Sequence, residues 1–85
     1  MGGDWKMYAV FYSEGGDVGQ LATRRPFVGK QAAIEYAKKH LEYLVDVGGW
    51  FVLIPVAELK KVGKQEKDAV TVEEETMRVY DGEWR

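Results

Sequence analysis

The sequence predicts an α+β fold in a small single domain: a mainly antiparallel β-sheet, in the order strand, strand, helix, strand, strand, with one amphipathic helix packed on one face. Three observations lead to this prediction. Residues 29–49 carry helical periodicity, the stretches 5–13 and 50–56 are apolar and of strand length, and glycine-rich or charged segments separate the other short β-like pieces. The 85 residues fit one domain, whose core gives only modest stability.

The first predicted strand covers residues 5–13, which read WKMYAVFYS and are rich in residues that favour strands. Both of its faces are largely apolar or aromatic. This indicates either a central strand or a strand whose second face, bearing Tyr8 and Tyr12, meets a partner. Residues 14–19 contain three glycines and are predicted to form the turn of a hairpin.

The return strand of this hairpin is predicted over residues 20–25. Pro26 follows it and cannot donate a ladder hydrogen bond, so the strand is expected at the edge of the sheet. In a strand, successive side chains point to opposite faces, and Arg24 and Arg25 would therefore lie on opposite sides.

The predicted helix lies within residues 29–49. Gly48 and Gly49 follow its last periodic residue and give a clear stop signal, whereas Gly29 is a weak cap at its start. Apolar residues at helical spacing form one inward face. The residues of this face are Ala33, Ile34, Ala37, Leu41, Leu44 and Val45.

A second row of residues runs along the flank of the helix, beside its apolar face. It consists of Tyr36, His40, Tyr43 and Val47. In one interpretation the row is the margin of the core, covered by the curvature of the sheet, because Tyr and His are commonly half-buried. In the other it is a contact surface, because aromatic residues with a polar tip are enriched at interfaces.

The rest of the chain is predicted to complete the sheet. Residues 50–56 read as a buried strand, and residues 57–62 either extend it, which is favoured, or form a turn. Residues 63–68 are predicted to be a charged turn. Two short β-like pieces, 69–72 and 76–80, follow and are expected to pair with the preceding strand as a second hairpin.

The two ends of the chain carry weaker signals. Residues 1–4 are expected to be flexible, and Asp81-Gly82 is expected to form a turn in the unassigned tail 81–85. Trp84 is unusual at a free end, since a bulky apolar residue there generally packs on the body or on another chain. Three consecutive glutamates at 73–75 alternate faces on a strand, so a solvated edge is expected.

Composition narrows the classes of function. The formal net charge is −2, with residues 1–40 carrying six basic against four acidic side chains and residues 41–85 six against ten. This balance argues against bulk affinity for nucleic acids. Cysteine is absent, no apolar run is long enough to span a membrane, and no signal peptide is recognised. The chain is therefore expected to be soluble and cytoplasmic, without a membrane partner.

No catalytic residue, metal site or cofactor is predicted, and the chain is not expected to be an enzyme. His40 is the only histidine, so a zinc site would need three carboxylates or a second chain. A triad of Ser13, His40 and Asp46 is disfavoured because Ser13 lies beside Glu14 and two glycines, a context typical of a turn.

The favoured hypothesis is a small non-catalytic protein-binding module, such as an adaptor, an inhibitor or a homodimerising accessory protein. It rests on aromatic surface in excess of what so short a chain is able to bury, and the partner is a protein or a second copy of the chain. The predicted contact residues are Tyr8, Tyr12, Arg24, Arg25, Tyr36, His40, Tyr43 and Trp84.

Two other hypotheses remain open. A nucleic-acid-binding domain would use Arg24, Arg25 and Lys30 with the tyrosines of the first strand, although the net acidity counts against it. Gly29-Lys30 does not make a phosphate loop, because Gln31 replaces the Ser or Thr that would hold magnesium. An enzyme or small-ligand binder has little room for a pocket unless a dimer builds it.

Overall fold

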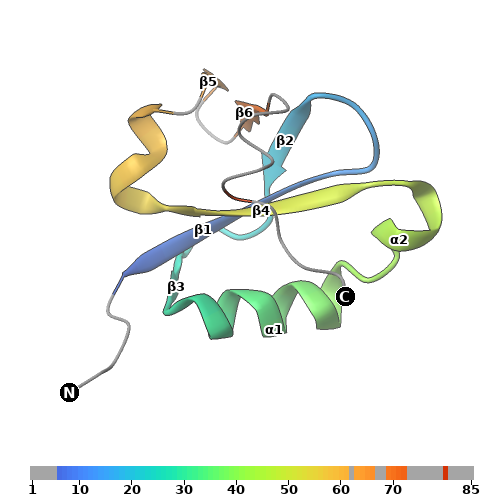
Figure 1. Ribbon diagram of the computed structural model, residues 1–85, viewed down its shortest axis with the longest axis horizontal. Helices are drawn as coiled ribbons and strands as arrows, with labels where there is room; N and C mark the ends of the chain where they lie inside the picture. Colours follow the sequence, from blue (N-terminus) through green and yellow to red (C-terminus); the bar gives the residue numbers. More distant parts are fainter. Residues whose placement is uncertain (1–5, 62, 67–68, 73–79, 81–85) are drawn as a thin grey trace.

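The computed structural model describes residues 6–61, 63–66, 69–72 and 80. Its strands are antiparallel throughout, and they are joined in one sheet with α1 as the main helix (Figure 1). The α+β prediction is therefore confirmed. In chain order the elements are β1 (Met7–Ser13), β2 (Val18–Leu21), β3 (Phe27–Val28), α1 (Lys30–His40), α2 (Leu44–Val47), β4 (Trp50–Pro55), the 3₁₀ helix η1 (Val56–Lys61), β5 (Gly63–Glu66) and β6 (Ala69–Thr71).

The strand β1 is central, as its two apolar faces predicted. Along one edge it pairs with β2 near Tyr12 and with β3 near Tyr8, and along the other edge it pairs with β4 over its whole length from Tyr8 to Ser13. The sheet continues from β2 to β6 and then to β5. Because β1 joins three strands, it fixes which side chains reach each face.

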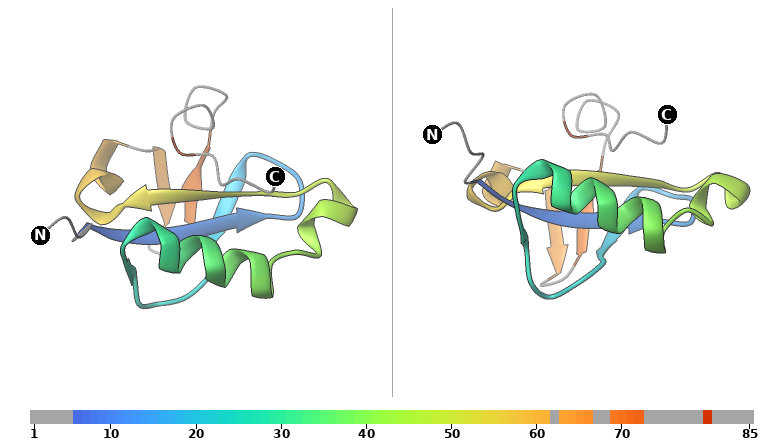
Figure 2. Two further views of the ribbon diagram at one scale, coloured as in Figure 1. Left: turned by 60° about the horizontal axis from the view of Figure 1, so that its bottom comes forward. Right: turned by 90° about the horizontal axis from the view of Figure 1, so that it is seen from below.

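The core has two parts, one on each face of the β1–β4 pair. Figures 1 and 2 show α1 along one face, with η1, β5 and β6 on the other side. Side chains alternate between the faces along each strand, so both faces of an apolar strand are able to contribute. The cluster on the helix side contains Val10, Ala33, Ala37, Leu41, Leu44, Phe51 and Leu53. The cluster on the opposite face contains Ala9, Phe11, Val52, Ile54, Val70 and Val72.

The predicted order of elements is wrong in detail. A short strand, β3, precedes the helix, and residues after Pro55 form η1 instead of a strand extension. In the 3₁₀ helix, Leu59 packs against the cluster on the face opposite α1. An extended chain would carry Leu59 away from this cluster. Residues 63–66 of the predicted charged turn are the strand β5, which pairs with β6. Strand pairing has overridden the low strand propensity of this polar segment.

The return strand also differs from its prediction. It begins two residues earlier, at Val18, and it is not an edge strand, because β6 pairs with its outer side. The chain leaves the strand after Leu21 and bends, with the Thr23 hydroxyl donating a hydrogen bond to the carbonyl of Arg25 at 2.7 Å. Arg24 and Arg25 therefore lie exposed in a connecting loop rather than on two faces of a strand.

The helix predicted within residues 29–49 is broken near its end. Leu41 closes α1, and the next backbone bonds join Leu44 to Leu41 and Val45 to Glu42, which is the tighter i to i+3 pattern. The chain then forms the single turn α2, and Gly48 ends it at φ 72°, ψ 25°, the left-handed conformation that its stop signal predicted.

The break changes which residues face inward. Ala33, Ala37, Leu41 and Leu44 are buried as predicted, and Ile34 is half-buried. Val45 is exposed, because the extra winding between the two helices rotates it away from the core. The inward prediction for Val45 is wrong for that reason.

Several expectations fall on residues that the structure does not describe. These are the predictions for residues 1–4, for the glutamates at 73–75, for most of the piece 76–80, for Asp81-Gly82 and for Trp84. Among the described residues, none of the helices has the length and apolar character needed to cross a membrane.

Candidate functional site

The predicted tyrosines of the first strand lie on the helix side of the sheet. Tyr8 and Tyr12 are half-buried and pack against the cluster beneath α1, so their rings are only partly available for contact. Tyr36 is half-buried as well. Its ring contacts Phe27 at a centroid distance of 5.1 Å and His40 at 4.7 Å. This side of α1 is thus an aromatic margin of the core, with exposed His40 at its outer end.

The most exposed member of the predicted aromatic set is Tyr43. It lies between α1 and α2 and is 42% exposed, while Val45 and Val47 on α2 are 56% and 53% exposed. Scattered exposed apolar residues are ordinary on a soluble domain, but three within five positions are a concentration. Only Leu44 of α2 is buried. The helical turn therefore presents apolar side chains outward while one leucine holds it to the core.

Acidic side chains lie beside these apolar residues in the chain and on the neighbouring β1–β2 turn. Glu42 and Asp46 are exposed beside them in the chain, and Glu14 and Asp17 are exposed on the β1–β2 turn. Segments 12–23 and 41–59 contain no lysine or arginine. The basic residues that flank them are Arg24, the last turn of α1 and Lys60. We call this surface the acidic end. It comprises Glu14, Asp17, Glu42, Tyr43, Val45, Asp46 and Val47.

Two hydrogen bonds join the β1–β2 turn to the neighbouring segments of the acidic end. The hydroxyl of Tyr43 donates to the Glu14 carboxylate at 3.0 Å, and the indole Nε1 of Trp50 donates to the carbonyl of Gly16 at 2.9 Å. The donors come from residues 43–50 and the acceptors from the turn. A turn with two adjacent glycines, Gly15 and Gly16, is flexible by composition, so these bonds hold its position relative to α2.

Gly49 lets the chain pass close to the end of β1. A methyl group at this position would overlap the carbonyl oxygen of Ser13, and it would lie 2.8 Å from Leu44 Cδ2 and 3.2 Å from Glu14 Cα. From its place after the last periodic residue, Gly49 was predicted only to end the helix. Its role in the structure is to allow α2 and the β1–β2 turn to lie side by side.

Replacing Gly49 with alanine should therefore lower the free energy of unfolding by about 1–3 kcal/mol, because the contacted atoms are mostly backbone and cannot rotate away. Chemical denaturation followed by circular dichroism measures the loss. Lys39→Ala, at an exposed helical position, is the matched control and should change stability by no more than about 0.5 kcal/mol. Equal small effects of both substitutions would contradict the close approach at Gly49.

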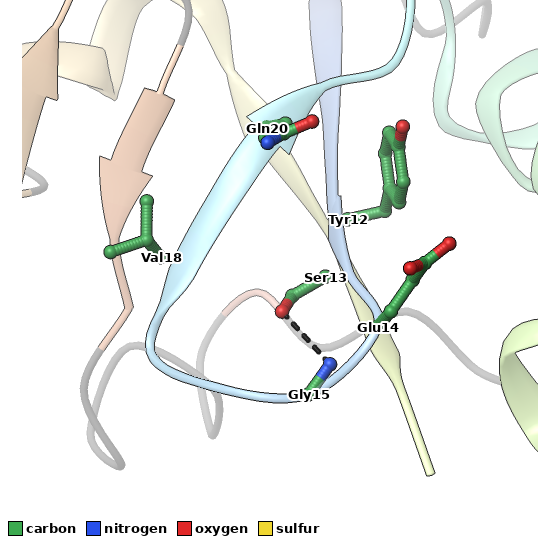
Figure 3. A pocket seen from close by; sticks show the side chains of 6 residues that line it. All are labelled: Tyr12, Ser13, Glu14, Gly15, Val18 and Gln20. Carbon is green, nitrogen blue, oxygen red and sulfur yellow. Dashed lines mark hydrogen bonds between the residues drawn. The ribbon is translucent and has the colours of Figure 1, made fainter. Parts of the chain in front are cut away.

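A polar pocket of about 310 Å³ opens beside the β1–β2 turn (Figure 3). Figure 3 shows the Tyr12 and Glu14 side chains on one side of the turn and Ser13 pointing toward Gly15, whose N–H donates to the Ser13 hydroxyl at 3.1 Å. Ser13 is buried. The lining residues are Tyr12, Ser13, Glu14, Gly15, Val18 and Gln20.

The pKa of Tyr43 is raised above its ordinary value. The main cause is partial removal of its hydroxyl from water, followed by the hydrogen bond to Glu14 and by the negative charge of that carboxylate; Tyr12 adds a smaller effect in the same direction. The phenol therefore stays neutral at physiological pH and keeps its hydrogen available for Glu14. At the opposite side of the fold, the Tyr80 hydroxyl donates to Glu58 at 2.6 Å, and this bond raises the pKa of Tyr80.

These shifts predict a loss of stability at alkaline pH. A tyrosine whose pKa is higher in the folded state contributes stability that is complete below the unfolded pKa of about 10 and disappears as the pH rises through the folded value. Tyr43→Phe should therefore decline less in stability than the wild type as the pH rises above about 10. Denaturation curves at several pH values test this. Identical declines would show that the Glu14 contact does not form in solution.

The remaining predicted residues do not assemble into one site. Arg24, Arg25 and Lys30 are exposed before and at the start of α1, away in sequence from the acidic end. Ser13 takes part in the turn and His40 stacks on Tyr36, so neither contact is that of a catalytic triad. Within the described part of the chain, no group of three or more His, Cys, Asp or Glu side chains is placed to hold a metal ion.

Comparison of the chain with models of protein families, with curated proteins and with solved structures gives no match. The assignment of a function thus depends on the geometry of the chain itself. Tyr43 is the one member of the acidic end among the predicted contact residues, and Val47 belonged to the predicted flank row. The members not predicted are Glu14, Asp17, Glu42, Val45 and Asp46. A signal for Glu14 is the lack of any lysine or arginine over 12–23 and 41–59, the two segments that contain the acidic end.

Proposed function

We propose that this chain is a non-catalytic protein-binding module whose contact surface is the acidic end. The observation that supports this most directly is the exposure of Tyr43, Val45 and Val47 on one short helical segment. Such a segment offers an apolar centre, and interface centres are commonly enriched in aromatic and apolar side chains while their rims are polar. The hydrogen bonds from Tyr43 and Trp50 to the neighbouring turn reduce the ordering cost of binding.

The charge of the acidic end selects the kind of partner. Glu42 and Asp46 are exposed next to the apolar residues in the chain, and Glu14 accepts a hydrogen bond from Tyr43. Asp17 is exposed on the same turn as Glu14, and segments 12–23 and 41–59 carry no lysine or arginine. Opposite charges across an interface accelerate association and exclude partners of like charge. The proposed partner is therefore a protein surface that combines apolar side chains with lysine or arginine. The nucleic-acid hypothesis has less support, because Tyr8 and Tyr12 pack against the helix instead of lying open for base stacking.

A pair of bait variants tests this proposal. The full chain and the double variant Tyr43→Ala/Val47→Ser are used to capture proteins from the native host, with Lys39→Ala as a control bait outside the acidic end. A true partner should bind the wild type and the control, and its affinity for the double variant should fall by roughly tenfold or more. Tyr43 and Val47 are exposed, so the fold should persist, and circular dichroism verifies this.

Two further measurements complete the test. Affinity for the captured partner should weaken as salt concentration rises, because the carboxylates of the acidic end are exposed and screened. Glu42→Gln and Asp46→Asn should also slow association more than they speed dissociation. A partner that binds the double variant as tightly as the wild type contacts another surface and would refute the proposal.

A further inference from the structure

The polar pocket of Figure 3 is built by both strands of the β1–β2 hairpin and by the turn between them. Tyr12 and Gln20 are direct partners across the ladder, so their side chains share a face. Val18 lies two residues before Gln20 on β2 and is therefore on that face as well. Tyr12 packs against the helix-side cluster, and Glu14 is bonded to Tyr43 between α1 and α2. The pocket thus adjoins the acidic end.

The turn that lines this pocket is fixed along its whole length. Each of its residues, 14–17, is held by a hydrogen bond, and most of the partners lie far away in the chain. The bonds join Tyr43 to Glu14 at 3.0 Å, Gly15 to Ser13 at 3.1 Å, Trp50 to Gly16 at 2.9 Å and Val72 to Asp17 at 2.7 Å. A site whose backbone is already ordered loses less conformational freedom when a ligand binds.

Glu14 is the one charged side chain among the residues that line the pocket. A carboxylate is able to accept several hydrogen bonds through its two oxygens. The Tyr43 hydroxyl donates to Oε2 alone, and a neutral phenol does not cancel the negative charge. Among the described residues, no lysine or arginine pairs with Glu14. The pocket therefore has a net negative charge that a cationic ligand would neutralise.

The other side chains of the pocket complete the description of this ligand. The Tyr12 hydroxyl and the Gln20 amide are able to accept hydrogen bonds, and neither is bonded to another described residue. Val18 is 40% exposed and offers an apolar wall for a methylene chain. The volume of about 310 Å³ is at the lower end of the range for ligand pockets, which favours a single side chain over a cofactor.

We propose that this pocket receives one lysine or arginine side chain of the protein that binds the acidic end. The cationic group lies against the Glu14 carboxylate, and the methylene chain lies along Val18. This inference rests on the proposed function, whose partner presents apolar and basic side chains together. A side chain of that partner is favoured over a free small cation because Tyr43, an exposed apolar contact of the acidic end, also holds Glu14. One bound protein would therefore cover both.

A titration of the full chain followed by nuclear magnetic resonance tests the pocket without the partner. The probes are Nα-acetyl-arginine amide, Nα-acetyl-lysine amide and the neutral Nα-acetyl-citrulline amide. Each cationic probe should shift the amide resonances of residues 12–20, and the citrulline probe should not. The shifts should weaken as salt concentration rises, because the Glu14 carboxylate is exposed and screened.

A matched pair of variants assigns this binding to Glu14. Glu14→Gln removes the charge but keeps an oxygen that accepts the Tyr43 hydrogen bond, so the turn should stay in place. Affinity for the cationic probes should fall by roughly tenfold, since hydrogen bonds to charged groups are the stronger ones. Glu35→Gln is the control: it makes the same change of charge at an exposed position of α1 and should leave the affinity unchanged. Circular dichroism verifies that both variants fold.

The captured partner provides the second test. Its affinity should fall roughly tenfold with Glu14→Gln and stay unchanged with Glu35→Gln. Truncating the inserted basic residue of the partner should have little further effect in the Glu14→Gln background, because the two groups act as a pair.

Three outcomes would overturn the inference. They are the absence of any shift with the cationic probes, equal shifts with the citrulline probe, and a partner whose affinity is the same for Glu14→Gln and Glu35→Gln. If that partner still depends on Tyr43 and Val47, the pocket inference fails alone and the proposed function stands. If the partner binds Tyr43→Ala/Val47→Ser as tightly as the wild type, the proposed function fails.

Discussion

Truncation of Phe51 to alanine is expected to lower the free energy of unfolding by about 3–5 kcal/mol. Phe51 is completely buried and is the largest side chain of the helix-side cluster. It projects from β4 toward Ala33 and Ala37 of α1, and these small residues cannot fill the volume that an aromatic ring leaves. The cost therefore includes both the lost transfer of the ring from water and the cavity that remains.

Chemical denaturation at one fixed protein concentration measures this loss, since self-association would add a concentration-dependent term. Phe27→Ala is the matched control. Phe27 is only half-buried at the margin of the same cluster, where its ring contacts Tyr36, so the same truncation should cost less. If the two substitutions cost the same, Phe51 does not hold α1 to the sheet in the way its burial indicates.

The centre of the fold could be predicted because its local patterns agree with its packing. The strands β1 and β4 are apolar on both faces, and they are the pair with a layer on each side. The β1–β2 turn was predicted from its glycines, and Gly48 takes the left-handed conformation expected of a helix stop. At these places the residues that favour an element locally are also the ones that pack in the core. Local sequence and tertiary contacts therefore favour the same structure.

The periphery could not be predicted because contacts with other segments decide its structure. Residues 63–66 are polar and read as a turn, yet β6 supplies backbone partners that make them a strand. The strand β6 also pairs with β2, which was predicted to be an edge strand and is therefore an interior one. The 3₁₀ helix η1 forms where Leu59 packs against a cluster whose buried residues come from β1, β4 and the segment 70–72. The pairing of β6 with β2 joins residues far apart in the chain, which no window of sequence contains. The β5–β6 pairing is local, but the polar residues of β5 give no strand signal.

The candidate site was partly predicted. Tyr43 was included because it lies on a polar-aromatic row beside the core, and that row is indeed less buried than the inward face. Tyr8, Tyr12 and Tyr36 belong to the same set of predicted contacts but are half-buried against the helix-side cluster. Tyr43 is more exposed than these three tyrosines because it lies at the break after α1, where Val45 is also turned outward. A uniform helical projection contains no such break.

The break between α1 and α2 leads to a second prediction: truncation of Leu44 and truncation of its neighbour Val45 should differ widely in their effect on stability. Leu44→Ala should cost about 2–5 kcal/mol, because Leu44 is fully buried and is the one side chain of α2 that packs in the core. Val45→Ala should change stability by no more than about 0.5 kcal/mol, because its side chain is 56% exposed. A continuous helix through this region would bury both residues and make both truncations costly.

Denaturation of the two single variants distinguishes these arrangements, and amide hydrogen exchange gives an independent measurement. The backbone bonds from Leu44 to Leu41 and from Val45 to Glu42 close a short turn, which should open more readily than the bonds inside α1. If Val45→Ala were as costly as Leu44→Ala, the helix would continue through residues 41–43. Val45 would then turn toward the core, and the acidic end would lose one of the apolar residues on which its proposed binding depends.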